Sequence, residues 1–276
     1  MSTPHARRCL LAATVAAAML LLAGCADATS VAVQEFTPRA PGDLVVATAF
    51  PAPGFWEGAT AATADGGFEW ALATALADRL GLRLRVVNAP FDDLAAGRFG
   101  DADVAIAQIS ITNDRRTRME LSSPYYTTDA AVLVRDGDDV ADLKAARELR
   151  WAVVAGTTGQ DVVNDRVRPI ATVQAVADEG AAADAVAAGT VDAALLDLPT
   201  ALALAHDTAG LEVVARVATT EEYAIASPLG DTRNAEAVDA AVRAFERDGT
   251  LDALAEQWLE PVFGVNPADL PTIRIR

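Results

Sequence analysis

Nineteen consecutive residues carry the strongest structural signal of this chain, and they read Asp101-Ala-Asp-Val-Ala-Ile-Ala-Gln-Ile-Ser-Ile-Thr-Asn-Asp-Arg-Arg-Thr-Arg-Met119. The apolar run at the start predicts a buried strand that ends at Ile106 or Ala107. A polar turn over residues 108–112 follows, and Arg115 then lies near the start of a predicted helix. Hydroxyls, backbone N–H groups and a guanidinium should therefore converge at the carboxyl end of a strand, where open α/β sheets bind ligands. Arginine suits a carboxylate at such a place because its planar fork donates two hydrogen bonds, although a surface ion pair is its alternative role.

The N-terminus has the layout of a secretory signal. Arg7 and Arg8 precede an apolar run that is shorter than the roughly 20 residues of a membrane span. The run closes with Leu22-Ala-Gly-Cys25, which resembles the bacterial lipobox, the alternative being an ordinary signal peptide with an incidental cysteine. We therefore expect a lipoprotein signal peptide over residues 1–24, a lipidated Cys25 that anchors the protein to the cell membrane, and a flexible tether over residues 25–42.

Charge and cysteine content narrow the class of protein. The two cysteines are Cys9 and Cys25, so a chain cut before Cys25 keeps no pair for a disulfide or for a cysteine-rich metal site. That cut also removes Arg7 and Arg8 and no acidic residue, which changes the formal net charge from −17 to −19. Nucleic-acid binding needs clustered positive charge, so we expect no nucleic-acid partner. No residue spacing predicts a metal site or a phosphate-binding loop, and we expect no cofactor.

Strand-like apolar runs alternate with helical patterns along the rest of the chain. Apolar residues recur at helical spacing between Phe68 and Leu80, and Gly81 follows as a C-cap signal, which predicts a helix over residues 68–80. Such alternation predicts an α/β protein with parallel sheets covered by helices. The predicted strands are Leu44–Thr48, Leu84–Val87, Val104–Ala107, Val132–Val134, Trp151–Val154, Ala193–Leu196 and Leu211–Val214.

Nine short motifs in order resemble a known family. They are Gly67-Phe-Glu-Trp70, Pro90-Phe91, Asp101-Ala-Asp-Val104, Ile109-Ser-Ile-Thr112, Arg115, Ser123-Pro-Tyr-Tyr126, Gly156-Thr-Thr-Gly159, Asp192-Ala-Ala-Leu-Leu-Asp197 and Asp248-Gly-Thr-Leu251. Any one of them is weak, but together and at fitting intervals they resemble the family 3 extracellular solute-binding proteins, which are the amino-acid receptors of ABC importers. The resemblance covers about residues 43–262.

The resemblance implies the type II periplasmic-binding-protein fold, in which two α/β lobes are joined by two crossover hinge strands and the ligand lies in the cleft between the lobes. Carried over to this chain, lobe 1 would comprise residues 43–131 plus 221–276, and lobe 2 residues 132–220. The crossovers would lie near Ala131–Arg135 and Thr219–Tyr223. Hinge closure is a common way to bury a small polar solute.

The resemblance also implies a set of cleft residues. Arg115 matches the family's carboxylate-binding arginine, and Asp197 matches the aspartate that pairs with the α-ammonium of an amino acid. A buried zwitterion needs partners for both of its charges. Phe91 matches an aromatic that stacks on the ligand side chain, and Phe50 is expected on the opposite wall. The other implied ligand-binding residues are Gln108, Ser110, Thr158 and Gly159.

Some of these residues also fit purely structural roles. Asp197 precedes a predicted helix over residues 200–205 and has the position of its N-cap. Residues 156–159 also fit an ordinary strand–helix turn. An aromatic after proline, such as Phe91, is often simple core packing.

The chain departs from the family pattern at several cleft positions. Ala49 stands where several amino-acid receptors have a further aspartate, and Ala155 replaces a lysine of glutamine receptors. Gln108 stands where many relatives have a small residue, and Leu196 where some have a polar one. A single anionic anchor for the ammonium fits a cationic amino acid less well, and leaves room for a neutral amino acid or another solute.

The expected function is capture of an amino acid or a similar small carboxylate, with delivery to an ABC permease at the membrane. We expect no enzyme, because His206 is the one histidine after the signal and no nucleophile-elbow sequence accompanies it. Two alternatives stay open on the same fold. One is an exported cyclohexadienyl (prephenate/arogenate) dehydratase with Glu57 or Glu69 as its general acid. The other is a ligand-sensing module that signals through a membrane partner.

Overall fold

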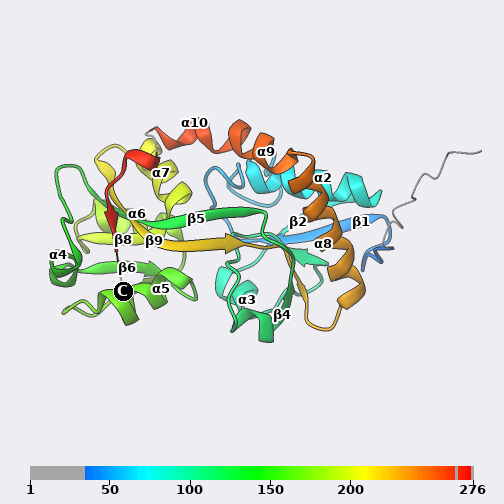
Figure 1. Cartoon of the computed structure of the whole chain (residues 1–276), viewed down its shortest axis with the longest axis horizontal. Helices are drawn as coiled ribbons and strands as arrows, with labels where there is room; N and C mark the ends of the chain where they lie inside the picture. Colours follow the sequence, from blue (N-terminus) through cyan, green and yellow to red (C-terminus); the bar gives the residue numbers. More distant parts are fainter. Residues whose placement is uncertain (1–34, 265–266, 275–276) are drawn as a thin grey trace, which may run out of the picture. The chain divides into compact units, whose positions relative to one another are not determined.

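Two β-sheets, each covered by helices, make up the part of the chain that the structure describes (Figure 1). The structure is a computed structural model that describes residues 35–264 and 267–274. Residues 34–276 form one compact unit. The predicted signal peptide and Cys25 lie outside the described residues. We call the first sheet and its helices lobe 1, and the second sheet and its helices lobe 2.

The first sheet has the strand order β2-β1-β3-β10-β4. Strand β1 (Asp43–Thr48) pairs in parallel with β2 (Arg83–Asn88) and with β3 (Val104–Ala105). Strand β10 (Ala226–Pro228) runs antiparallel between β3 and β4 (Met119–Leu121). The parallel strands end at one edge of the sheet, and the polar turn after β3 begins there.

Helix α2 (Phe68–Leu80) confirms the helix that the apolar spacing predicts. Leu72 and Leu76 are fully buried in the lobe 1 core. Gly81 takes the left-handed conformation, with φ of 70°, and its N–H donates to Asp78 O, which ends the helix. The same core includes α8 (Thr232–Arg247) and α9 (Thr250–Trp258), whereas α3 (Phe91–Ala95) packs on the other face of the sheet.

The second sheet has the strand order β11-β9-β5-β8-β6-β7. Its apolar cores lie on both faces, one beneath α6 and α7 and the other beneath α4 and α5. The sheet is mixed and not purely parallel as predicted, because β5 runs antiparallel to both β8 and β9. The elements are β5 (Tyr126–Arg135), α4 (Leu143–Glu148), β6 (Trp151–Val154), α5 (Thr158–Val162), β7 (Gln174–Val176), α6 (Glu179–Ala187), β8 (Ala193–Asp197), α7 (Leu198–Asp207), β9 (Leu211–Tyr223) and β11 (Thr272–Ile273).

Strands β5 and β9 run side by side from the second sheet toward the first as an antiparallel pair (Figure 1). At the lobe 1 end Tyr126 pairs with Tyr223, and the register shifts between Thr128 and Ala130. Both strands are longer than their apolar runs predict, because polar residues continue the pairing beyond the buried core. The segment expected as the first crossover, Ala131–Arg135, lies inside the second sheet, so the crossing occurs a few residues earlier.

Both ends of the described chain are attached to the lobes. Strand β11 pairs in parallel with β9, although the sequence analysis assigned this segment to lobe 1. At the other end the Thr37 N–H donates to Asn234 Oδ1 (2.8 Å) and the Arg39 N–H donates to Asp103 Oδ1 (2.7 Å). Asn234 and Asp103 are buried and need such partners. The described part of the expected tether is therefore bonded to lobe 1.

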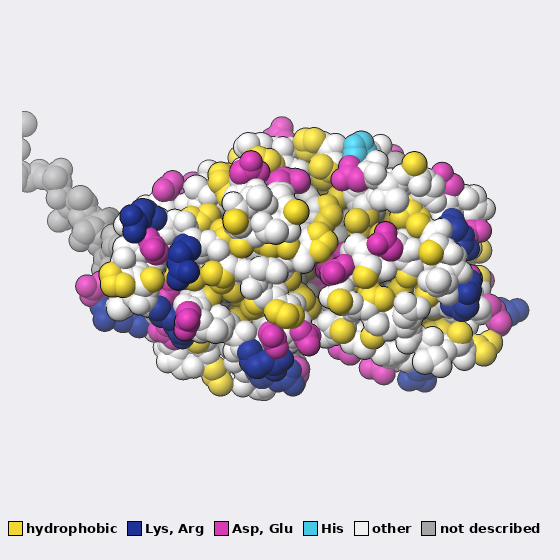
Figure 2. Space-filling view, turned by 180° about the vertical axis from the view of Figure 1, so that it is seen from behind, with side chains coloured by type: hydrophobic (Ala, Val, Ile, Leu, Met, Phe, Trp, Pro, Cys, Tyr) yellow, Lys and Arg dark blue, Asp and Glu magenta, His cyan; other side chains and the backbone are white. Residues whose placement is uncertain are grey.

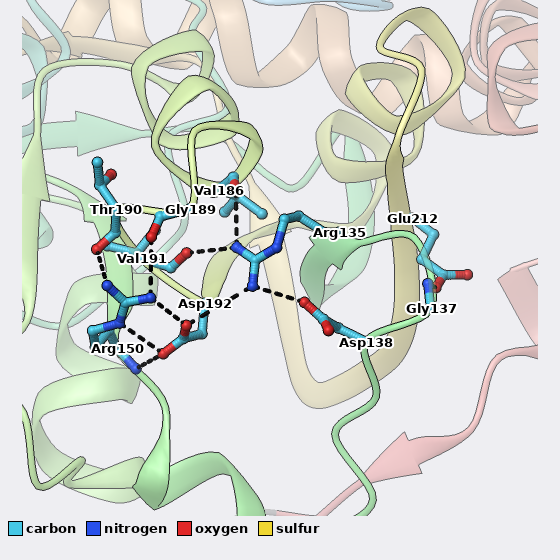
Figure 3. Close-up of polar contacts among 10 residues, drawn as sticks. All are labelled: Arg135, Gly137, Asp138, Arg150, Val186, Gly189, Thr190, Val191, Asp192 and Glu212. Carbon is cyan, nitrogen blue, oxygen red and sulfur yellow. Dashed lines mark hydrogen bonds and ion pairs between the residues drawn. The ribbon is translucent and has the colours of Figure 1, made fainter.

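A cluster of ion pairs joins the amino ends of β6 and β8 (Figure 3). Arg150 donates to both carboxylate oxygens of Asp192, and the hydrogen bonds from Arg150 are the main reason that the pKa of Asp192 is lowered. Arg135 pairs with Asp138, and both arginines donate to backbone carbonyls in or next to the connection between α6 and β8. Ligand sites in such sheets lie at the carboxyl ends of the strands, so this cluster serves the fold at the opposite end.

Acidic side chains are spread over the surface seen in Figure 2, where lysine and arginine side chains form small separate groups. The distribution accords with the formal net charge of −17. Among residues 35–264 and 267–274, no helix is long and apolar enough to cross a membrane.

Candidate functional site

The turn after β3 is fixed by a buried carboxyl group on α2. Glu69 accepts hydrogen bonds from the Gln108 N–H (2.7 Å), from Trp56 Nε1 (2.7 Å) and from the Tyr125 hydroxyl. Burial raises the pKa of Glu69 to about 7, against the opposing effect of these donors. Gln108 adopts a φ of 52°, which is uncommon outside glycine. Glu69 therefore holds the start of the turn, and its oxygens face protein donors.

Arg115 is buried and reaches from lobe 1 to lobe 2. Its side chain is 5% exposed and lies at the start of a 3₁₀ turn, Arg115–Thr117. Nη1 donates to Ser110 O (3.0 Å), and Nη2 donates to Gly156 O in lobe 2 (3.2 Å). Burial is the main cause that lowers the pKa of Arg115, whereas Glu221 and Asp197 act to raise it. A guanidinium held between the lobes can bind an anionic group there.

The two phenylalanines differ in their relation to Arg115. The Phe91 ring lies under the guanidinium, with 5.6 Å from Arg115 Cζ to the ring centroid, a cation–π contact. Phe91 is also partly buried against the lobe 1 core, so both of its expected roles stay open. Phe50 packs edge-on against Trp56, with ring centroids 6.1 Å apart. None of its described contacts joins Phe50 to Arg115 or to Asp197.

The turn over residues 156–159 brings backbone close to lobe 1. Gly156 has a φ of 76°, and a Cβ there would lie 3.4 Å from Asp92 of α3. The Thr157 hydroxyl accepts from the Gln160 N–H (3.2 Å) and caps α5. Residues 156–159 thus form a capped strand–helix turn, and the same turn carries Thr158 and Gly159 into the cleft.

Asp197 ends β8 at the carboxyl edge of the second sheet. It occupies the N-cap position of α7, but its side chain accepts no capping hydrogen bond. Burial is the main cause that raises its pKa well above the usual value, and the neighbouring Glu221 acts in the same direction. Tyr223 lies close enough to lower that pKa, although its hydroxyl makes no hydrogen bond of normal geometry. The Asp197 carboxyl is therefore available to a cationic partner.

Glu221 is a site residue that the sequence reasoning missed. It lies on β9 and is 7% exposed, and its Oε2 accepts from the hydroxyls of Ser110 (2.5 Å) and Thr158 (2.6 Å). Its other oxygen, Oε1, is buried and has no hydrogen-bond partner among the described residues. No motif marks this residue, because the apolar signal of its strand fades after Val214. A longer alternating pattern that includes Thr219 and Glu221 is the signal that could have found it.

A second missed carboxyl group belongs to Glu179, the first residue of α6. Burial raises its pKa to about 7. Glu179 shares with Asp197 the lining of a small cavity of about 20 Å³, to which Thr157, Gly159 and Thr200 also contribute. Across the cleft, the Thr200 hydroxyl donates to Gln108 Oε1 (2.9 Å). Within the described residues, no group of His, Cys, Asp and Glu side chains is arranged to hold a metal ion.

Direct contacts and shared cavities therefore bring seven of the eight expected ligand-binding residues together where the lobes meet, whereas the eighth, Phe50, packs against the lobe 1 core. The cleft holds the Arg115 guanidinium, several hydroxyl groups and the carboxyl groups of Asp197, Glu221 and Glu179. This arrangement can bind a small solute that carries both a negative and a positive charge.

Comparison with known proteins agrees with this geometry. The model of the bacterial extracellular solute-binding proteins, family 3, matches residues 44–261. Among curated proteins, the L-cystine-binding protein TcyJ of Escherichia coli (strain K12) is 28% identical over 197 residues, which are 70% of this chain and 73% of that protein.

Solved structures show the same fold. An amino acid ABC transporter substrate-binding protein from Streptococcus pneumoniae, bound to L-arginine, superposes with a TM-score of 0.71 at 29% identity, over 82% of this chain and 95% of that one. An ancestral amino-acid-binding protein, AncCDT-1, described as a precursor of cyclohexadienyl dehydratase, gives a TM-score of 0.71 at 27% identity, over 79% and 96% of the two chains. These matches confirm the two-lobed type II fold expected from the sequence.

Proposed function

We propose, because this chain belongs to the family 3 bacterial extracellular solute-binding proteins, that it binds a free amino acid between its lobes and delivers it to an ABC importer. The relatives support this ligand class, since one is a cystine-binding protein and another was solved with L-arginine. The observation that carries the proposal is Arg115, a buried guanidinium that spans the cleft within electrostatic reach of Asp197.

In this proposal each charge of the amino acid has its own partner. Arg115 binds the α-carboxylate, and the turn that carries Thr158 and Gly159 contributes further donors. Asp197 binds the α-ammonium. The positive charge of the ammonium stabilises the ionised form of Asp197, which burial disfavours in the absence of a cationic partner. Gln108, Ser110 and Phe91 form the lobe 1 side of the proposed ligand site, and Phe50 lies at the margin of that side.

Hinge motion would take place where the lobes are joined. The register shift at Thr128–Ala130 interrupts the β5–β9 pairing, and on the opposite strand Thr220 has a φ of 52°. Asp129 bridges this irregularity, because it accepts from the Thr220 N–H (3.1 Å) and from Arg216 Nη1 (3.2 Å). We therefore place the lobe boundaries at this point, close to the expected divisions at residues 131 and 221.

Attachment to the membrane completes the proposal. The family is extracellular, and the Leu22-Ala-Gly-Cys25 sequence supports cleavage before Cys25 and its lipidation. A lipid anchor would keep the protein near its permease. The dehydratase alternative has less support, because both of its candidate acids bind protein groups. Glu69 accepts from three donors, and Glu57 Oε1 accepts from the Gly54 N–H (3.0 Å).

The test is calorimetric titration of the protein without residues 1–29, refolded to remove bound solute, against the common amino acids and prephenate. We expect saturable binding of an amino acid without turnover, and a loss of at least about 100-fold in affinity in Arg115→Ala, because two or more charge-assisted hydrogen bonds disappear. Arg116→Ala is the matched control, since Arg116 is exposed one residue away. Unchanged affinity in Arg115→Ala, or product formation from prephenate, would contradict the proposal.

A further inference from the structure

Glu221 holds the hydroxyl groups that a ligand carboxylate would need. Ser110 belongs to lobe 1 and Thr158 to lobe 2, and both donate to the same carboxylate oxygen of Glu221. A serine or threonine hydroxyl has a single hydrogen to donate. While Glu221 keeps both bonds, neither hydroxyl can donate to a second carboxylate.

Only one of the two carboxylate oxygens of Glu221 accepts hydrogen bonds from the described residues. Its Oε1 is buried without a hydrogen-bond partner among the described residues, and none of their ion pairs involves Glu221. A buried carboxylate oxygen without a partner is unfavourable. The charge of Glu221 is one of the causes that raise the pKa of Asp197, so the two carboxyl groups lie near each other. The Glu221 side chain is therefore held by two hydroxyl groups, with one of its oxygens unpartnered and a second carboxyl group nearby.

The structure also offers space into which Glu221 can move. A cavity of about 250 Å³ lies beside it, lined by Thr112 of lobe 1, by Arg166 of lobe 2 and by Thr219 of the crossover. A rotation of the side chain into this cavity would bring the carboxylate toward a guanidinium and free both hydroxyls.

We propose that the Glu221 carboxylate is an internal competitor of the ligand, which occupies the Ser110 and Thr158 hydroxyls and is displaced into the adjoining cavity when a ligand carboxylate takes its place. This inference rests on the proposed function and deepens it. Affinity would then be set by an exchange of one carboxylate for another, and Glu221 would weaken binding of every ligand held through these two hydroxyls.

The first experiment uses a simple carboxylate as the probe. Thermal unfolding of the wild type and of Glu221→Ala is followed in sodium acetate and in sodium chloride at equal ionic strength. We expect acetate to raise the Tm of Glu221→Ala saturably, because it fills the place of the missing carboxylate, and to leave the wild type unchanged relative to chloride. No acetate-specific rise in Glu221→Ala, or an equal rise in both proteins, would overturn the proposal.

The second experiment measures affinity for L-arginine, L-glutamine and L-cystine, each beside an analogue whose α-carboxylate is replaced by an amide. We expect Glu221→Ala to bind at least one of the amino acids about tenfold more tightly than the wild type, which corresponds to about 1.4 kcal/mol, with a smaller gain for the amide, whose carbonyl oxygen is a neutral and therefore weaker acceptor. Glu222→Ala is the matched control, since it removes an exposed charge from the next position of the same strand. Weaker binding by Glu221→Ala would identify Glu221 as a ligand anchor instead, and unchanged binding a structural role.

The outcomes separate this inference from the proposed function. Should no amino acid bind to the wild type or to any variant, while acetate stabilises Glu221→Ala alone, the ligand class is wrong and the role of Glu221 stands. If Glu221→Ala fails to fold, Glu221→Gln serves in its place, because the neutral amide keeps the shape of the side chain. We expect its amino-acid affinity to exceed that of the wild type, and equal or weaker affinity would overturn the proposal.

Discussion

Asp197 occupies the N-cap position of α7 but leaves the helix N–H groups without a side-chain partner. Chain position alone predicted two roles for this residue, and only the direction of the side chain separates them. Glu221 shows the opposite case, because nothing in its local sequence distinguishes it from the exposed Glu222 beside it. Sequence motifs therefore point to Arg115 and Asp197. The position of Glu221 depends on how β9 pairs with β5, and the sequence does not reveal the register of that pairing.

Substitution of Asp197 should separate ligand binding from stability. In Asp197→Asn we expect amino-acid affinity to fall at least about tenfold, because the ammonium loses a charge-assisted partner. The free energy of unfolding at neutral pH should stay equal or rise, since burial raises the pKa of Asp197 and its ionisation therefore opposes folding. Calorimetry and urea denaturation measure the two quantities. Full affinity in Asp197→Asn would remove Asp197 from the site.

Glu69 should make stability depend on pH. Its pKa is raised from 4.5 to about 7 by burial, so between these values the folded state binds more protons than the unfolded state. Stability linked to Glu69 is therefore highest below pH 4.5 and falls by about 3 kcal/mol as pH rises through 7. The test compares urea denaturation of the wild type and Glu69→Gln across this range.

Glu69→Gln should remove its part of that slope and lower stability by about 1–3 kcal/mol at acid pH, because an amide N–H would face protein donors. Glu179, whose pKa is also about 7, contributes a similar slope that the variant keeps. Glu148→Gln is the control, since this side chain is exposed on α4. Identical slopes in the wild type and Glu69→Gln would show that Glu69 ionises as readily in the fold as in the unfolded chain.

Among the helices and strands, those marked by local sequence features match their predicted bounds better than those held by long-range pairing. Helix α2 matches its expected bounds, because both its apolar spacing and its terminal glycine are local features. Strand β9 extends to Tyr223, well beyond its apolar run, because its second half is held by pairing with β5. Likewise β3 is shorter than expected: it ends at Ala105, although Ile106 and Ala107 are buried and the Ile106 N–H still donates to Ala47 O (3.0 Å). Long-range pairing is thus what the sequence pattern could not predict.

Gly156 should be required both for its turn and for the approach of the lobes. In Gly156→Ala, the left-handed φ of 76° should cost about 1–2 kcal/mol of stability. The added Cβ would also lie 3.4 Å from Asp92 in lobe 1, at the edge of ordinary van der Waals contact, so it would hinder any closer approach of the lobes and we expect weaker ligand affinity. Gly210→Ala is a matched control, because Gly210 has a φ of 88° with no atom within 4 Å of an added Cβ. Urea denaturation should show similar losses for the two variants, and calorimetry should show a loss for Gly156→Ala alone; equal affinities would exclude a role for this contact in closure.

At the scale of the whole molecule, each lobe has its own apolar cores, although Phe263 packs against one core of each lobe. The lobes are linked by β5 and β9, by the C-terminal chain that leads from α9 in lobe 1 to β11 in lobe 2, and by polar contacts such as Arg115 to Gly156 and Gln108 to Thr200. Polar contacts exchange readily with water or ligand, whereas separation of an apolar core would be costly. The fold therefore permits the lobes to move as bodies about the crossover while their interiors stay intact.

We propose that lipidation of Cys25 anchors the whole molecule to the membrane. In Cys25→Ala, expressed with its own N-terminus in a bacterial host, we expect the protein to leave the membrane fraction, because acyl chains supply about 0.8 kcal/mol of membrane affinity per buried methylene. Cys9→Ala is the matched control, since Cys9 lies within the predicted signal and should leave the protein membrane-bound with a lipid-sized mass increase on Cys25. Fractionation and mass spectrometry of the N-terminal peptide provide the measurements. Ligand affinity should be equal in all three proteins, because residues 34–276 form a compact unit that contains the cleft. A Cys25→Ala protein that stays with the membrane would show that something other than this cysteine anchors it.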